Sequence, residues 1–95
     1  MIKVINMRDY NNKCPSWAMR VDRATKWGNE YTHLSYGKGK YKVKTQKEAV
    51  EMFEKEQLPR IVKEARKELP KNTPFACWCS PGFCHALILW EAVNV

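Results

Sequence analysis

The chain has 95 residues, of which 44% are hydrophobic and 12% aromatic. A chain this short supports one hydrophobic core, so we expect a single domain spanning residues 1–95. No segment approaches the roughly 18 apolar residues of a membrane span, and the first ten residues lack the apolar run of a secretory signal. The composition therefore excludes contact with a membrane core and predicts a soluble protein of the cytoplasm.

The chain is strongly basic. Seventeen Lys and Arg residues stand against ten Asp and Glu residues, which gives a formal net charge of +7 and a pI near 9.4. This balance favours anionic partners such as nucleotides, nucleic acid or acidic proteins. Net charge also keeps small proteins soluble, so charge alone does not choose between these functions.

Two short strands are predicted in the first part of the chain. Residues 2–7 are mostly apolar, as in a buried strand, and residues 9–16 carry the Asp, Asn, Pro and Ser typical of tight turns. Residues 17–21 form the second predicted strand. Residues 23–40 hold three of the four glycines and show no clean period, which predicts a long loop. Long loops in compact domains are often functional.

Residues 40–44, KYKVK, alternate lysine with other side chains, as a strand with two different faces does. One interpretation is an edge strand that its lysines protect against unwanted pairing. The other is a row of phosphate-binding groups. Under the second interpretation, the candidate nucleic-acid-binding residues are Lys38, Lys40, Lys42 and Lys44.

A helix is predicted to begin at Thr45, because Thr45 and Glu48 match a capping box. An apolar stripe at helical spacing then continues to Leu69. Pro59 lies inside this stripe and lacks a backbone donor, so we expect either a kink or a second helix that begins near residue 59. Pro70 ends the pattern.

The last two predicted elements are a strand at 73–79 and a buried helix in the almost continuously apolar segment 85–95. The order is strand, strand, loop, edge strand, helix or helix pair, strand and helix. This alternation predicts an α/β domain in which a short mixed or parallel sheet packs with two or three helices.

The segment 75–85, FACWCSPGFCH, contains three of the four cysteines. Its first two cysteines lie at the carboxyl end of a predicted strand and its last at the amino end of a predicted helix, where open α/β sheets hold ligands. The unpaired amides of a helix start stabilise a thiolate and attract phosphate. Cys84 is therefore the candidate nucleophile and His85 the candidate acid or base.

Two other interpretations of this segment remain open. Tetrahedral zinc is commonly held by three cysteines and one histidine, and the candidate ligands are Cys77, Cys79, Cys84 and His85. The single residue between the first two is unusual for zinc, and Cys14 could replace one ligand from the other side of the sheet. The structural interpretation is that the cysteines are small apolar fillers. A disulfide is disfavoured, because the cytoplasm keeps thiols reduced.

The segments RATKWGNEY (23–31) and FACWCSPGFCHALIL (75–89), with INMR near the start, resemble a family of small phage and bacterial domains of unknown function. Its members carry a Trp-Gly-Asn-Pro-Phe loop, a middle helix and a late Cys-Trp-Cys-x-Pro-x-x-Cys-His element. The resemblance covers nearly the whole chain. The matching residues in this sequence are Arg23, Trp27, Gly28, Asn29, Cys77, Trp78, Cys79, Pro81, Cys84 and His85.

The chain departs from the family pattern at two places. Glu30 and Tyr31 replace Pro-Phe, and Leu87 stands where the family has an Asp shortly after Cys-His. The missing carboxylate could have oriented a histidine or held a metal. The resemblance brings no settled activity with it, so whether this chain catalyses a reaction stays open.

The two motifs meet if strands 17–21 and 73–79 lie side by side and parallel, since their carboxyl ends then share one edge. The resulting pocket would use Arg23 for an anion, Trp27 for stacking on a base, Gly28 for close backbone approach and Asn29 for a base edge. Trp27 can equally be a core residue. We predict a phage-type domain that binds a nucleotide or nucleic acid in this pocket.

The alternative is a non-enzymatic basic protein that binds a host protein or DNA and uses its cysteine cluster, with or without zinc, for structure. The location is the host-cell cytoplasm if the chain is phage-encoded. His33 lies outside both motifs and is interpreted as a loop residue.

Overall fold

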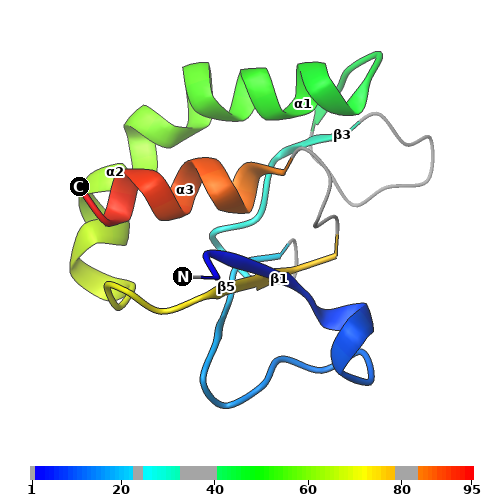
Figure 1. Cartoon of the computed structure of the whole chain (residues 1–95). Helices are drawn as coiled ribbons and strands as arrows, with labels where there is room; N and C mark the ends of the chain where they lie inside the picture. The colour runs from blue at the N-terminus through cyan, green and yellow to red at the C-terminus, as the bar shows by residue number, and fades with distance from the viewer. Residues whose placement is uncertain (1, 23–24, 33–40, 79–83) are drawn as a thin grey trace.

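The computed structural model describes residues 2–22, 25–32, 41–78 and 84–95. Its main sheet lies beneath the helix α3 (His85–Val93), α1 (Gln46–Met52) lies above α3, and α2 (Leu58–Glu68) descends from the end of α1 beside α3 (Figure 1). The elements are β1 (Val4–Asn6), the 3-10 turn η1 (Met7–Tyr10), β2 (Met19–Arg20), β3 (Tyr31–Thr32), β4 (Tyr41–Lys42), α1 (Gln46–Met52), the π turn η2 (Phe53–Gln57), α2 (Leu58–Glu68), β5 (Phe75–Cys77) and α3 (His85–Val93).

The main sheet has three strands in the order β1-β5-β2, and both pairings are parallel. Phe75 of the central strand is in register with Val4 on one side and with Met19 on the other. The predicted α/β class with a short parallel sheet is confirmed, and so is the parallel pairing of the second and last main strands. All three carboxyl ends therefore lie at one edge of the sheet.

A second, two-stranded sheet pairs β3 with β4, and Tyr31 is in register with Tyr41. Residues 31–32 belong to the segment predicted as a loop, so the structure adds a strand there. Two residues are too few to show a period in the sequence. The remaining part of that predicted loop, residues 33–40, lies outside the described residues.

The predicted helix begins where the capping pattern places it. The hydroxyl of Thr45 accepts a hydrogen bond from the backbone N–H of Glu48 at 3.1 Å. The prediction of a second helix near residue 59 is confirmed, because α2 begins at Leu58 with Pro59 in its first turn, and the π turn η2 joins it to α1. Pro59 has no N–H for the carbonyl four residues earlier, and a wider turn relieves the clash at that carbonyl. Leu69 then leaves the helix in an extended conformation.

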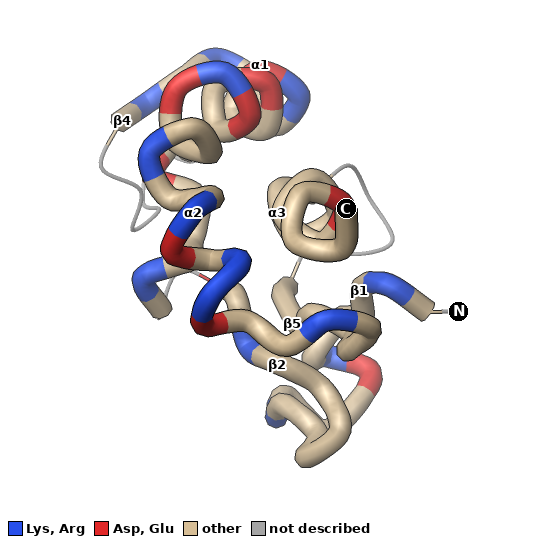
Figure 2. The backbone as a smooth tube through the Cα atoms, turned by 90° about the vertical axis from the view of Figure 1, so that its left-hand side faces the viewer, with Lys and Arg blue, Asp and Glu red and all other residues tan. Residues whose placement is uncertain are grey.

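The core lies between the sheet and the helices. Figure 2 shows α3 almost free of charged residues, with the sheet below it, α1 above it and α2 beside it, and both of those helices carry many charged residues. Such an apolar helix is stable only when it is covered on most sides. No helix in the described residues is long and apolar enough to cross a membrane. The main core is built by Val21, Trp27, Phe53, Ala65, Leu69, Phe75, Cys77, Cys84, Ala86, Leu89, Trp90 and Val93.

The opposite face of the sheet carries a smaller cluster. Ile5, Met7 and Ala76 are buried there, and Cys14 and Ala18 pack against them. The two clusters divide β5 by the alternation of its side chains, since Phe75 and Cys77 face the helices while Ala76 faces away.

Candidate functional site

The carboxyl edge of the main sheet lies beside the start of α3 (Figure 1). Two side-chain hydrogen bonds join its three strands. The amide of Asn6, at the end of β1, donates to the carbonyl oxygen of Trp78 at 3.2 Å. The indole Nε1 of Trp78, directly after β5, donates to a carboxylate oxygen of Asp22 at 2.7 Å. Trp78 is nevertheless 37% exposed, so this edge presents a fixed indole to solvent.

Asp22 is the buried acid of this edge, with 5% of its surface exposed. Its two oxygens accept hydrogen bonds from Nε and Nη2 of Arg20 at 2.7 and 2.9 Å, the two-pronged arrangement typical of strong guanidinium pairs. The hydrogen bond to Asp22 raises the pKa of Arg20 further above its usual range. Sequence reasoning missed Asp22, although an acid directly after a predicted parallel strand was a usable signal.

The predicted pair of Cys84 and His85 forms the start of α3, beside this edge of the sheet. Cys84 is the N-cap residue of α3, and its sulfur accepts a hydrogen bond from the backbone N–H of Ala86 at 3.4 Å. The sulfurs of Cys84 and Cys77 are 3.2 Å apart. Both cysteines are buried, so the structure places these sulfurs in the core rather than on an open surface.

His85 contacts both its chain neighbour and the end of β2. Its Nε2 is 2.9 Å from the carbonyl oxygen of Val21. Because a carbonyl only accepts, Nε2 carries the hydrogen and donates it. The other ring nitrogen, Nδ1, faces the Cys84 sulfur at 3.8 Å. This is the arrangement in which a histidine takes a proton from a thiol, and the catalytic roles of Cys84 and His85 stay predictions.

The structure describes only part of the predicted zinc set. Within residues 2–22, 25–32, 41–78 and 84–95, no group of three or more His, Cys, Asp or Glu side chains is arranged to hold a metal ion. Cys79 lies outside these residues, so the set of Cys77, Cys79, Cys84 and His85 stays a prediction. Cys14 packs on the other face of the sheet, and its sulfur donates to the carbonyl oxygen of Ala18 at 3.4 Å.

The Trp-Gly-Asn motif is built into the interior. Trp27 is 4% exposed and packs in the main core, with the Lys26 ammonium 4.9 Å from its ring centre. The side-chain amide of Asn29 donates to the carbonyl oxygen of Ala49 at 3.0 Å, and its oxygen accepts from the N–H of Tyr31 at 2.9 Å. In the described part of the chain, Trp27 and Asn29 therefore pack against and hydrogen-bond to other residues of the protein, and their ligand-binding roles stay predictions.

Gln57 holds the motif from the π turn and was not singled out by sequence reasoning. Its buried amide donates to the carbonyl oxygen of Gly28 at 2.8 Å and accepts from the N–H of Glu30 at 2.8 Å. Gly28 does not have a positive φ, so this position does not need glycine for its backbone angles. The lack of a side chain on Gly28 instead leaves room for Gln57 to approach the backbone. Arg23, the predicted anion ligand, lies outside the described residues.

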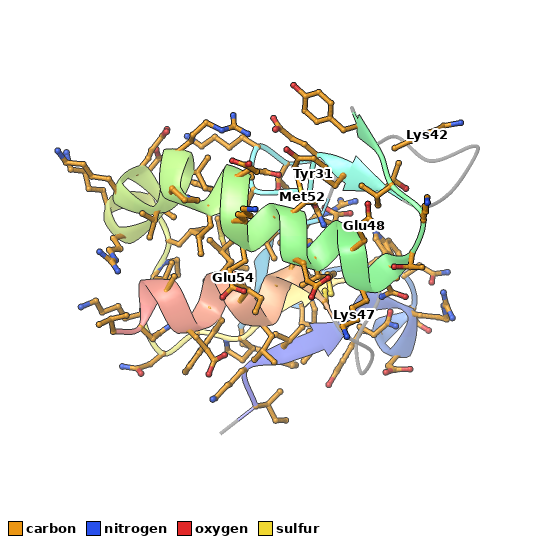
Figure 3. All side chains as sticks on the ribbon, turned by 90° about the horizontal axis from the view of Figure 1, so that it is seen from above. Tyr31, Lys42, Lys47, Glu48, Met52 and Glu54 are labelled. Atoms are coloured by element: carbon orange, nitrogen blue, oxygen red, sulfur yellow. The ribbon has the colours of Figure 1, made fainter. Side chains whose placement is uncertain are left out.

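The lysine row is described only in part. Lys42 and Lys44 are exposed, and Figure 3 shows Lys42 pointing away from the body of the protein. The rings of Tyr31 and Tyr41 lie against each other beside it, 5.1 Å apart between centroids. Lys38 and Lys40 lie outside the described residues, and the phosphate-binding role of all four lysines stays a prediction.

Comparison with known proteins supports a family but no activity. The family described as Domain of unknown function (DUF4326) matches residues 5–95. No curated protein and no solved structure matches the chain significantly. The match spans the parallel sheet, the π turn and the junction between β5 and α3, and it agrees with the small domain of unknown function that the sequence motifs predicted. The chain therefore belongs to the DUF4326 family.

Proposed function

We propose that this DUF4326 domain binds a nucleotide or nucleic acid at the carboxyl edge of the β1-β5-β2 sheet, with Trp78 stacking on a base. The observation that carries the proposal is the position of Trp78. The residue is 37% exposed, yet hydrogen bonds from Asn6 to its carbonyl and from its own Nε1 to Asp22 hold it in place. A held aromatic ring loses little entropy when a base stacks on it.

Two exposed arginines near the ends of the strands would bind the phosphate part of the ligand. The Arg20 side chain is 46% exposed beside Asp22, and Arg8 is exposed two residues after the end of β1. The chain as a whole carries a net charge of +7. An exposed aromatic ring that shares its carboxylate partner with an exposed guanidinium suits a ligand that joins a flat base to phosphate.

The proposal moves the stacking role from Trp27 to Trp78. Trp27 was the predicted base-stacking residue, but its ring is 4% exposed and fills the core. Cys84 and His85 lie beside the same edge, where His85 contacts the end of β2. The proposal concerns binding alone, in the cytoplasm of a host cell if the chain is phage-encoded.

Fluorescence anisotropy with a labelled single-stranded oligonucleotide tests the proposal, and unlabelled mononucleotides serve as competitors. Trp78→Ala is expected to weaken binding about 5-fold to 150-fold, the range that corresponds to one stacked base. Trp17→Ala is the matched control, because Trp17 is 48% exposed but precedes the amino end of β2. Affinity should also fall steeply as salt rises.

Competition by mononucleotides separates the two ligand sizes. Full competition by a mononucleotide places the natural ligand among nucleotides, whereas binding of oligonucleotides alone places it among nucleic acids. Titrations that stay flat with every base and length tested, or equal affinity for wild type and Trp78→Ala, would reject the proposal.

The second candidate is the non-enzymatic interaction protein, and one observation favours it. Tyr10 and Trp17 are 38% and 48% exposed, and their rings touch edge to face with centroids 5.4 Å apart. Exposed aromatic pairs are common anchors for protein partners. Under this alternative, Trp17→Ala and not Trp78→Ala is the substitution that removes binding to a host protein.

A further inference from the structure

Two buried cysteine sulfurs lie close together at the junction of β5 and α3. The Sγ atoms of Cys77 and Cys84 are 3.2 Å apart, and both residues are thiols in the structure. Disulfide sulfurs are about 2 Å apart, so closing a bond here takes a movement of about 1 Å. The two residues are also held by different elements, the end of a central strand and the start of a helix.

The surroundings of Cys84 suit the attacking sulfur of such a bond. As the N-cap residue of α3 it receives a hydrogen bond from the N–H of Ala86 at 3.4 Å, which stabilises negative charge on sulfur. Nδ1 of His85 lies 3.8 Å away and can accept the thiol proton. The Cys77 sulfur lies 3.2 Å from the Cys84 sulfur, within reach of a resolving thiol.

Burial restricts the oxidant that can reach the pair. Cys77 is 0% and Cys84 is 3% exposed, so a bulky disulfide such as oxidised glutathione cannot place its sulfur against either thiol without unfolding. Hydrogen peroxide is close to water in size. It is the oxidant class that matches this geometry.

We propose that Cys77 and Cys84 form a reversible dithiol–disulfide couple that hydrogen peroxide oxidises. The Cys84 thiolate attacks one peroxide oxygen, so an S–O bond forms, the O–O bond breaks and hydroxide leaves as water after protonation. The Cys77 sulfur then attacks the Cys84 sulfur, so the S–S bond forms, the S–O bond breaks and a second water leaves with the Cys77 proton. Two electrons pass from the thiols to one peroxide. A dithiol reductant restores the couple when the junction of β5 and α3 opens, because the same burial keeps it from the closed structure.

The oxidised couple would link the end of β5 to the start of α3, directly before Trp78 in the chain. The inference does not depend on the proposed nucleotide or nucleic-acid binding, since it concerns bonds within the protein. Its test therefore needs no ligand.

Peptide mapping of the wild-type protein carries the test. Trypsin leaves all three clustered cysteines on one peptide, because no Lys or Arg follows Lys71. Chymotrypsin cuts after Trp78 and Phe83 and so separates Cys77, Cys79 and Cys84. After limited peroxide treatment and alkylation of the remaining thiols, we expect a peptide pair that joins Cys77 to Cys84, loses two hydrogens in mass and is released by dithiothreitol.

Three single substitutions define the roles. Cys77→Ser should stop the reaction at a sulfenic acid on Cys84, which dimedone labels, and Cys84→Ser should abolish the linked peptide. Cys14→Ser is the matched control and should leave the linkage unchanged. Burial raises the pKa of the Cys14 thiol, which lowers the fraction of Cys14 present as the reactive thiolate.

Three results would overturn the couple. The first is a wild-type linkage that uses Cys79 or Cys14 in place of either partner. The second is full alkylation of Cys77 and Cys84 after peroxide treatment. The third is one equivalent of zinc in the purified protein by elemental analysis, since a bound metal would then account for the close sulfurs. The peptide map and the metal content of the wild-type protein test the couple even if a cysteine variant fails to fold.

Discussion

The indole nitrogen of Trp78 donates a 2.7 Å hydrogen bond to the carboxylate of Asp22, which joins the ends of two parallel strands across 56 positions of sequence. The same carboxylate holds Arg20 through two hydrogen bonds. One buried acid therefore orients both an exposed ring and an exposed cation. This relationship is the basis of the first prediction.

Asp22→Ala should lower the free energy of unfolding by about 2 kcal/mol, the usual contribution of hydrogen bonds to a charged group. It should also weaken oligonucleotide binding, because Trp78 and Arg20 both lose their fixed positions. Asp22→Asn keeps an acceptor for the indole and should retain more affinity than Asp22→Ala. Urea unfolding and anisotropy measure the two effects. Wild-type affinity in a folded Asp22→Ala protein would contradict the assigned orienting role.

Gln57→Ala should lower the free energy of unfolding by about 2–3 kcal/mol, because the carbonyl of Gly28 and the N–H of Glu30 lose their partner. Gln57 is 2% exposed, so water does not readily replace it. Glu54→Ala in the same π turn is the exposed control and should change stability by less than about 0.5 kcal/mol. Equal urea midpoints for the two variants would show that Gln57 does not hold the motif.

Trp27→Ala should cost about 3–5 kcal/mol of stability, as expected for removal of a large buried aromatic side chain. Trp27→Phe keeps most of the buried surface and should fold. If Trp78 is the stacking residue, Trp27→Phe should bind oligonucleotide like the wild type. A folded Trp27→Phe protein without binding would instead restore the ligand role that the sequence motif suggested.

Acidification should weaken the contact between the Trp-Gly-Asn segment and α2. Lys26 donates to Glu64 at 2.6 Å and to Glu68 at 2.8 Å, and the bond to Lys26 lowers the pKa of Glu64 below its ordinary value of 4.5. A lowered pKa means that the contribution to stability is present above that ordinary value and disappears as the pH falls through the folded-state pKa.

Glu64→Gln removes this titration, so thermal melting of the variant should depend less on pH across the acidic range. The groups are exposed, and salt should reduce the difference between wild type and variant. Parallel pH profiles of the two proteins at low salt would contradict the prediction.

Local patterns in the sequence predicted the elements that depend on neighbouring residues. The apolar run near the N-terminus forms β1, the Thr45 and Glu48 pattern begins α1, and the apolar C-terminal segment forms α3. These predictions succeeded because strand alternation, helix capping and helical periodicity are set within a few residues. The π turn was not predicted, because a kink and a widened turn are both compatible with Pro59.

The sequence by itself determined the family and the α/β class. Only the tertiary structure decided which tryptophan faces solvent: Trp27 is covered by core residues, whereas Trp78 extends past the end of β5. It also brought Asp22 to Trp78, Gln57 to Gly28 and Cys77 to Cys84. Burial and partners across such separations depend on how sheet and helices pack, and no local pattern carries that information.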